Sequence, residues 1–260
     1  MSNDKWQMRL DPDTDIGGVA QRFPVTRHSA IIAARSADQE VRRRALGTIV
    51  ESYWKPAYKY LRIKWQLSNE DAKDLVQGFF ASAIEKDYFT SYDSSKASFQ
   101  TFFRTCLERF VSNQKKSDQR LKRGGGNDHL SLDFNSAEDE LALHGNNAGA
   151  SFEDFFHKEW VRSLFALSIE TLRRRYEESS RDVYFQLFEL YDLRDDDTEQ
   201  RISYGSLAKQ FGISTTEVTN HLAAARREFR KVVLDKLREV TATEEEFRNE
   251  ARAILGIDVK

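Results

Sequence analysis

The sequence predicts an all-α protein built from two helical domains. Apolar residues recur at helical spacing along most of the 260 residues, no stretch alternates polar and apolar side chains as a strand would, and the chain holds only 3 Pro and 12 Gly. Hydrophobic residues make up 40% of the chain, which is enough for a buried core although 32% of the residues are charged.

Five segments follow one another along the chain: a polar N-terminal tail (1–23), a helical domain (24–126), an acidic flexible linker (127–159), a second helical domain (160–240) and a C-terminal helical extension (241–260). The linker is inferred from residues 133–159, which carry seven acidic residues, one Lys and a Gly-Asn run. The extension either packs back on a domain or acts as a regulatory segment.

The first domain begins with a helix whose apolar series runs from Val41 to Tyr53, and Pro56 predicts a break after it. Ser68 and Asp71 form a capping-box variant that starts a second helix. Its apolar face contains Leu75, Val76, Phe79, Phe80, Ala83 and Ile84. A polar stripe on another face contains Asp71, Asp74 and Gln77, and by spacing alone this is an ordinary solvated face.

An aromatic loop and a basic segment follow. The loop, residues 87–98, contains Tyr88, Phe89 and Tyr92, and the next helix runs from Phe99 to about Lys116. Residues 104–123 carry seven basic and two acidic residues. Cations interleaved with aromatic rings favour unstacked nucleic-acid bases as a ligand, because the rings stack on bases while the cations follow phosphates. Alternatively, the apolar side chains of this helix form the core, which is the better interpretation for Phe99, Phe103, Cys106 and Phe110.

The most informative string is SYGSLAKQFGIS, residues 203–214. It predicts a short helix, a turn at Gly212 that requires a positive φ, and a second helix capped by Ser214 and Glu217. This is the pattern of a DNA-binding helix-turn-helix, although an ordinary helical hairpin would share its spacing. The outer face of the second helix presents residues that can reach base edges or phosphates: Thr215, Thr216, Thr219, Asn220, His221, Arg226, Arg227 and Arg230.

Composition and spacing also exclude several classes. The single Cys cannot form an internal disulfide or a cysteine-based zinc cluster, and the five His show no metal-ligand spacing. No apolar run is long enough for a membrane span, and the N-terminus lacks a signal-peptide core. We therefore expect a cytoplasmic protein that is not an enzyme and needs no metal or cofactor.

The order of these strings resembles a known family. DAKDLVQGFF (71–80), the loop, FQTFFRTCLERFVSN (99–113) and the basic run are similar to the second conserved region of bacterial RNA polymerase sigma factors. SYGSLAKQFGISTTEVTNHLAAARREFR (203–230) is similar to their fourth conserved region. The short intervening segment resembles the extracytoplasmic-function (ECF) group, and residues 26–62 with KRGGG (122–126) resemble its large-sized branch.

The resemblance implies roles for particular residues. It implies that core RNA polymerase binds, through the clamp coiled coil of its largest subunit, to Asp71, Asp74, Gln77 and Phe80. It implies that the promoter minus-ten element contacts Tyr88, Tyr92, Phe102, Arg104, Asn113, Lys115, Lys116, Arg120, Lys122 and Arg123. The helix from Thr215 would then read the minus-thirty-five element. An anti-sigma factor or another regulator is a further partner that the resemblance leaves open.

Two other functions remain open at this point. A conventional helix-turn-helix regulator would usually dimerise on duplex half-sites and would need neither the polar stripe nor the aromatic loop. A DNA-processing enzyme such as a recombinase would need a nucleophile and a cationic or metal cluster, and the sequence shows neither.

Overall fold

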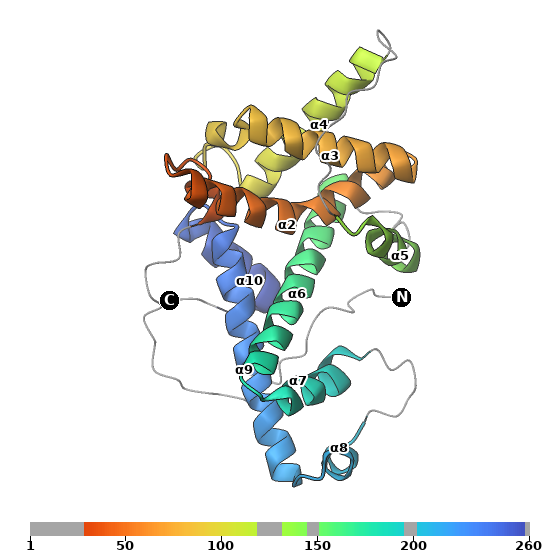
Figure 1. Ribbon diagram of the computed structural model, residues 1–260, viewed down its shortest axis with the longest axis vertical. Helices are drawn as coiled ribbons and strands as arrows, with labels where there is room; N and C mark the ends of the chain where they lie inside the picture. The colour runs from red at the N-terminus through yellow and green to blue at the C-terminus, as the bar shows by residue number, and fades with distance from the viewer. Residues whose placement is uncertain (1–28, 119–131, 145–150, 195–201, 258–260) are drawn as a thin grey trace. The chain divides into compact units, whose positions relative to one another are not determined.

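The structure is a computed structural model that describes residues 29–118, 132–144, 151–194 and 202–257, which are helical and contain no strand (Figure 1). The all-α prediction is confirmed. The described residues form two compact units: a large unit from residues 26–167 and 233–259, and a small unit from residues 168–232. The division falls inside two helices, α6 (Phe152–Glu178) and α9 (Thr215–Glu239). The five segments expected from the sequence stay predictions, because packing alone does not define which segments fold independently.

Three long helices and two short elements form the start of the large unit. These are α1 (Ala30–Ala33), α2 (Gln39–Lys64), α3 (Asn69–Glu85), the 3₁₀ turn η1 (Tyr88–Ser91) and α4 (Phe99–Asp118). Asp38 accepts hydrogen bonds from the first turn of α2, and Ser68 accepts one from the Asp71 N–H of α3. The expected break at Pro56 is wrong. Pro56 lies buried inside α2, where its missing N–H leaves one carbonyl without its helical donor but does not stop the helix.

The core of the large unit is aromatic, and Phe103 of α4 lies at its centre. Its ring contacts rings from α2, α3, η1 and α6, with centroid separations of 4.6 to 6.2 Å: Tyr53, Phe79, Phe80, Phe89 and Phe156. Phe103 has no exposed surface, and the Phe99 side chain next to it is also wholly buried. Phe99, Phe103 and Phe110 therefore belong to the core, as their spacing predicts.

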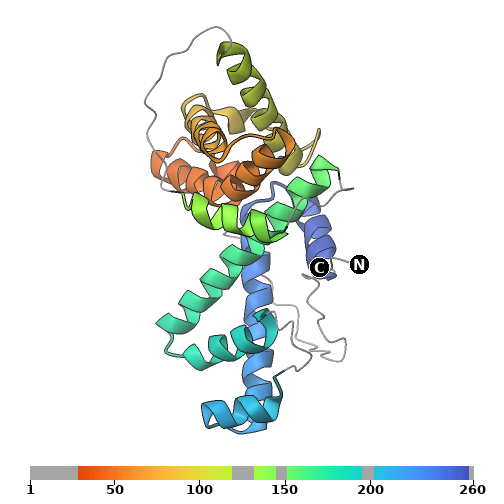
Figure 2. The same ribbon diagram turned by 90° about the vertical axis from the view of Figure 1, so that its right-hand side faces the viewer.

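The expected flexible linker instead contains a helix that packs on α2. Helix α5 (Phe134–His144) lies against α2 (Figure 2). The Phe134 ring contacts Trp54 and Tyr58, with centroids 5.3 and 5.1 Å apart. The acidic side chains of α5 pair with cations of α2: Glu138 with Arg62 at 2.7 Å, and Glu140 with Lys55 and Lys59 at 2.7 and 2.6 Å. The acidic composition that suggested a solvated linker is thus complementary to a basic helix face.

The first half of α6 completes this core. Phe156 and Trp160 are buried and contact Tyr60 and Tyr53. Between them, Glu159 forms an ion pair with Lys59 of α2 at 2.8 Å, and both side chains are only 3% exposed. Lys59 also meets Glu140, so one buried ammonium group neutralises carboxylates from two helices.

The small unit is a compact group of short helices packed on α9. It contains α7 (Asp182–Phe188), the π-helical turn η2 (Glu189–Leu193), α8 (Tyr204–Phe211) and the first part of α9. Its core is formed by buried apolar side chains from α7, α8 and α9: Leu187, Leu207, Ala208, Val218 and Leu222. This core fixes the angle at which α8 and α9 meet.

Removing the Lys59 ammonium group should destabilise the large unit strongly. In Lys59→Met, Glu159 and Glu140 stay buried without their cation, and loss of one partner of a buried pair costs about 3–5 kcal/mol of unfolding free energy. Urea unfolding followed by tryptophan fluorescence measures this, because Trp54, Trp65 and Trp160 all lie in the large unit. Arg43→Met, which breaks an exposed pair on the same helix, should leave the midpoint unchanged. Equal midpoints for Lys59→Met and wild type would contradict the structural role assigned to this pair.

Candidate nucleic-acid interface

The polar stripe of α3 lies on the surface of the large unit. Asp71 and Asp74 are exposed and Gln77 is partly exposed. Asp71 also belongs to the helix cap, since the Ser68 hydroxyl donates to its carboxylate at 2.7 Å. Phe80, which the resemblance placed on the partner face, is wholly buried against Phe103. That assignment is corrected: Phe80 supports the face from the core, and the side chains that reach the surface are Asp71, Asp74 and, in part, Gln77.

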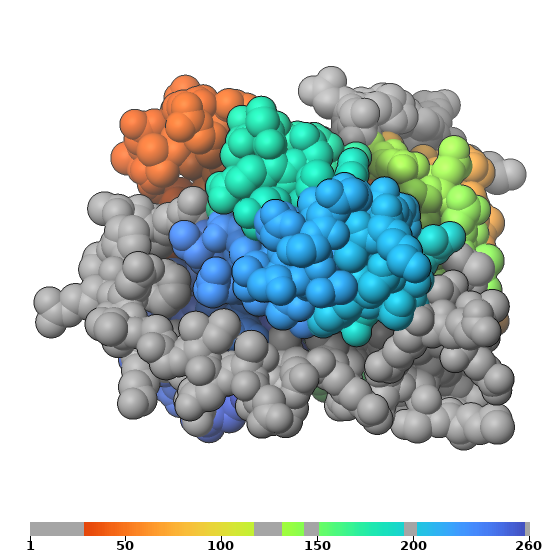
Figure 3. Space-filling model, turned by 90° about the horizontal axis from the view of Figure 1, so that it is seen from below, coloured from red at the N-terminus to blue at the C-terminus, as the bar shows by residue number. Residues whose placement is uncertain are grey.

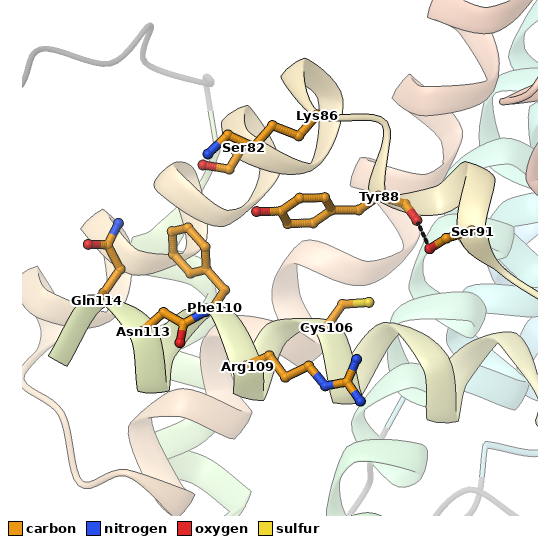
Figure 4. A pocket seen from close by; sticks show the side chains of 9 residues that line it. All are labelled: Ser82, Lys86, Tyr88, Ser91, Cys106, Arg109, Phe110, Asn113 and Gln114. Carbon is orange, nitrogen blue, oxygen red and sulfur yellow. Dashed lines mark hydrogen bonds between the residues drawn. The ribbon is translucent and has the colours of Figure 1, made fainter. Parts of the chain in front are cut away.

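A pocket of about 500 Å³ opens between the end of α3, η1 and the middle of α4 (Figure 4). Two rings, Tyr88 and Phe110, face into it, and Figure 4 shows Tyr88 reaching across the space toward α3. Its other lining side chains can donate or accept hydrogen bonds or carry positive charge: Ser82, Lys86, Ser91, Cys106, Arg109, Asn113 and Gln114. The pocket therefore combines an aromatic surface with polar groups and two cations.

The structure separates the aromatic residues that the sequence grouped together. Tyr88 lines the pocket, whereas Tyr92 is buried, with its ring against Phe99 and Phe102 and its hydroxyl donating to the Ala97 carbonyl at 3.0 Å. Tyr92 thus fixes the loop and is not available to stack on a base. Phe102 is partly exposed beside it. Cys106 was expected in the core but lies at the pocket, where partial burial raises the pKa of its thiol.

The predicted cations of α4 differ in their availability. Lys115 and Lys116 are exposed, and the Lys115 ammonium lies 4.6 Å from the Trp65 ring centroid. Arg104 is paired with Glu153 of α6 at 2.6 Å, which makes it a packing residue of the large unit. Asn113 is exposed at the pocket. Arg120, Lys122 and Arg123 lie outside the described residues.

Sequence reasoning missed Arg109 and Lys86. Arg109 lies one helical turn before Asn113 on α4, and this spacing alone places both side chains on one face. Lys86 directly follows α3 as its C-cap residue, and it reaches the pocket only because η1 folds back against α4. The first residue could therefore have been found from periodicity, and the second could not.

The turn of the small unit has the expected chemistry. Gly212 ends α8 with φ of 67°, a conformation that costs glycine little and other residues about 1 kcal/mol or more. The Ser214 hydroxyl accepts from the Glu217 N–H at 3.2 Å, and the Glu217 carboxylate accepts from the Ser214 N–H at 2.8 Å. These bonds from Ser214 hold the pKa of Glu217 below its usual value. The two helices are thus held at a fixed angle by a capped turn.

The first turns of α9 present small polar side chains to solvent. Thr215, Thr216, Thr219 and Asn220 are all exposed, and in the space-filling view α8 and the start of α9 (blue) form an uncovered surface (Figure 3). Arg227 and Lys231 are exposed further along the helix. The Thr219 hydroxyl donates to the Thr215 carbonyl at 3.0 Å, which orients its methyl group and oxygen.

Two residues predicted for this surface are held inside the small unit. His221 stacks on Tyr184 of α7, with ring centroids 4.0 Å apart. The Arg226 guanidinium binds both carboxylate oxygens of Asp192, at 2.9 and 3.0 Å, and lies over the Tyr191 ring. The assignment of Arg226 to phosphate binding is therefore corrected, because its donors are used to join η2 to α9. The Nε atom of Arg230 is buried without a hydrogen-bond partner.

A comparison with known protein families identifies the family of this chain. Residues 29–235 match the family described as ECF sigma factor. The chain belongs to the ECF sigma factor family. No curated protein and no solved structure matches the chain significantly. Membership assigns this ECF sigma factor a role in transcription initiation as a non-enzymatic factor, with core RNA polymerase and promoter DNA as the partners that membership implies.

Two kinds of feature are absent from the described residues of this ECF sigma factor. None of their helices is both long and apolar enough to cross a membrane. They contain no group of His, Cys, Asp and Glu side chains that could hold a metal ion.

Arg226 and Arg227 are neighbours in sequence that should respond differently to mutation. Arg226→Ala removes the bidentate contact with Asp192 and should lower the unfolding free energy of the small unit by roughly 1–2 kcal/mol. Arg227→Ala should leave stability unchanged and lower the affinity of the holoenzyme for DNA. The slope of the logarithm of that affinity against the logarithm of the salt concentration should become shallower by about 1, as expected for loss of one phosphate contact. Thermal unfolding by circular dichroism and DNA binding at several salt concentrations measure the two effects. Equal stability of the two variants would overturn the distinction.

Proposed function

We propose that this ECF sigma factor holds one unstacked base of the minus-ten element in the pocket between α3, η1 and α4. In the same complex, α3 contacts core RNA polymerase and the start of α9 contacts the minus-thirty-five element. The observation that carries the proposal is the composition of the pocket: two aromatic rings, amide and hydroxyl groups, and cations at an opening to solvent.

Each part of the pocket suits a flipped base. Tyr88, which is partly exposed, offers a ring surface on which a base can stack, and stacking on an aromatic side chain is worth about 1–3 kcal/mol per base. Phe110 is largely buried and gives the pocket an apolar wall. Asn113 and Gln114 carry amides that can pair with a base edge. This gain offsets the few kcal/mol needed to unpair and extrude a base from the duplex. The pocket thereby favours the melted promoter over the closed one.

Cations around the pocket supply the contacts to the DNA backbone. Lys86 and Arg109 line the pocket and are exposed, and Lys116 is exposed further along α4. Neutralising phosphates releases counterions and adds affinity that does not depend on sequence. These residues therefore position the strand, while the pocket selects a base.

The start of α9 suits readout of a duplex in the major groove. Recognition helices contact base edges through their N-terminal residues, and here those residues are exposed Thr and Asn side chains. Asn can bind adenine through two hydrogen bonds, and Thr offers both a hydroxyl and a methyl group. Arg227 and Lys231 lie further along the helix and suit phosphate contacts.

The polymerase contact rests on Asp74, which is exposed at the centre of the α3 stripe. A double variant, Asp74→Lys with Gln77→Ala, should lose competition with the housekeeping sigma factor for core RNA polymerase, because it places a cation where the partner meets a carboxylate. Competition binding with purified core enzyme measures this. Glu51→Lys makes the same change of charge at an exposed site on α2 and should compete like wild type. If wild type itself does not compete, a conventional DNA-binding regulator becomes the better interpretation.

The base pocket is tested by its aromatic surface. Tyr88→Leu should lower the affinity of the holoenzyme for its promoter by about 5- to 150-fold, which corresponds to loss of one stacked base. Tyr88→Phe keeps the ring and should stay close to wild type. The promoter fragments are first selected by the wild-type holoenzyme from random-sequence duplex DNA, and permanganate reactivity then reports melting. Wild-type melting by Tyr88→Leu would show that the pocket does not hold a base.

A further inference from the structure

Helix α10 (Glu244–Leu255) lies beyond residue 235, where the match to the ECF sigma factor family ends, and it is fixed to the large unit. Phe247 and Ala251 are buried, and the Arg238 guanidinium of α9 lies 3.9 Å from the Phe247 ring centroid. The sequence left open whether this extension packs back on a domain, and the structure shows that it does. The residues that α10 contacts suggest a role for this helix.

Glu246 joins the start of α10 to the start of α4. One oxygen of its carboxylate accepts from the Ala242 N–H at 2.8 Å, and the other accepts from the Phe99 N–H at 2.9 Å. Phe99 is the first residue of α4, so its N–H has no acceptor within its own helix. The carboxylate of Glu246 therefore caps α4 and ties it to the turn that precedes α10.

The same contact reaches the loop that forms the pocket. The Phe99 ring packs edge-on against Tyr92, with centroids 5.2 Å apart, and Tyr92 fixes the end of that loop. Arg35 donates to the Tyr92 carbonyl from the other side. The pocket itself is lined by Tyr88 and Ser91 of η1, and no residue of α10 takes part. Docked α10 thus supports the loop from behind and leaves the pocket open.

Glu250 lies one turn after Glu246 and is a poor residue for a buried interface. Its Oε1 accepts from the Gln100 side chain at 3.3 Å, while its Oε2 is shut off from solvent and has no hydrogen-bond partner among the described residues. Burial, and then the charge of Glu246, raises the pKa of Glu250 to about 7. An ionised Glu250 would have neither a cation nor a second donor, so the docked helix favours the protonated form.

We propose that α10 is a proton-sensitive brace of the loop of residues 87–98: protonation of Glu250 favours docking of α10, and docking holds the start of α4 and Tyr92 in the arrangement that reads DNA. The effect on DNA rests on the proposed function. The docking equilibrium rests only on contacts within the large unit.

The direction of the pH response follows from the raised pKa. The docked state binds the proton more tightly than the undocked state, so docking is strongest below pH 4.5, weakens as pH rises, and levels off above about 7. With a Glu250 pKa of about 7 in the docked state and 4.5 in the undocked state, the docking constant should fall roughly twentyfold between pH 5.5 and 7.5.

The other titratable groups around Glu250 are Glu246, the buried hydroxyl of Tyr53 and His157. His157 meets the Gln100 amide at 3.1 Å, and burial lowers the pKa of its imidazole. Charging of His157 below pH 6.5 therefore opposes the effect of Glu250. The difference between wild type and a Glu250 variant isolates the contribution of Glu250, because His157 is present in both.

Docking is measured without DNA, from the hydrogen-exchange protection factor of the Phe99 amide in the full chain across pH 5.5–8. Wild type should lose protection as pH rises. Glu250→Gln, which resembles the protonated carboxyl, should keep its protection, and Glu250→Met should give the same flat profile with a different side chain. Glu245→Gln removes a charge at an exposed site of α10 and should follow wild type. Equal profiles for Glu250→Gln and wild type would overturn the proton-sensitive contact.

The link to the loop is measured with the holoenzyme and promoter fragments that it selects from random-sequence DNA. Wild-type affinity should fall between pH 5.5 and 7.5 relative to Glu250→Gln, and truncation after Ala242 should lower affinity at every pH. Suppose that protection of the Phe99 amide changes with pH while the difference in promoter affinity between wild type and Glu250→Gln stays constant. That result would overturn the proposed effect of α10 on the loop. If no variant binds polymerase or promoter DNA at any pH, the proposed function fails, while the protection factors still decide whether docking depends on Glu250.

Discussion

Burial of the ring of Phe103 is the constraint on which the large unit depends. Five rings from α2, α3, η1 and α6 meet it, and each is held by helical geometry to a fixed face of its own element. Aromatic pairs in this geometry add about 0.5–1.5 kcal/mol each beyond their buried area. Once these faces point inward, periodicity decides what points outward: the stripe around Asp74 on α3 and the Arg109–Asn113 face on α4. The candidate binding surfaces of the large unit therefore lie on the outer faces of helices whose inner faces form one core.

Charge pairing inside the large unit decides which cations remain for DNA. Lys55, Lys59 and Arg62 of α2 are matched by carboxylates of α5 and α6, so α2 is electrically satisfied although its sequence is basic. The same holds for Arg104 and, in the small unit, for Arg226. The net charge of −2 does not reveal this internal pairing, and cations of α4 and α9 are among those exposed in the part of the chain that the structure describes.

Local chemistry could be predicted from the sequence, and tertiary partners could not. The Gly212 turn, the Ser214–Glu217 capping box and the start of α3 depend on residues three or four apart, so they could be predicted correctly. Spacing placed Phe80 correctly on the apolar face of its helix, and only the family resemblance assigned it to polymerase binding. His221 and Arg226 were placed on a binding surface because helical spacing does not reveal the ring or carboxylate that covers a side chain. For the same reason α5 was read as part of a flexible linker. Its acidic residues gain stability only beside the basic face of α2, which is about 80 residues away in sequence.

The two candidate DNA surfaces carry few cations, so under the proposed function they would have to bind the promoter at the same time. The start of α9 presents Thr and Asn rather than a cluster of cations, and the proposal places one base in the pocket, so each contact alone is weak. Weak contacts become specific when they are joined, because the first contact raises the effective concentration of the second. Under the proposed function, polymerase bound at α3 holds both units near one promoter, so that the two weak DNA contacts can form together. A chain built in this way gains little from binding DNA alone, and its selectivity then depends on the α3 contact as much as on the residues that touch bases.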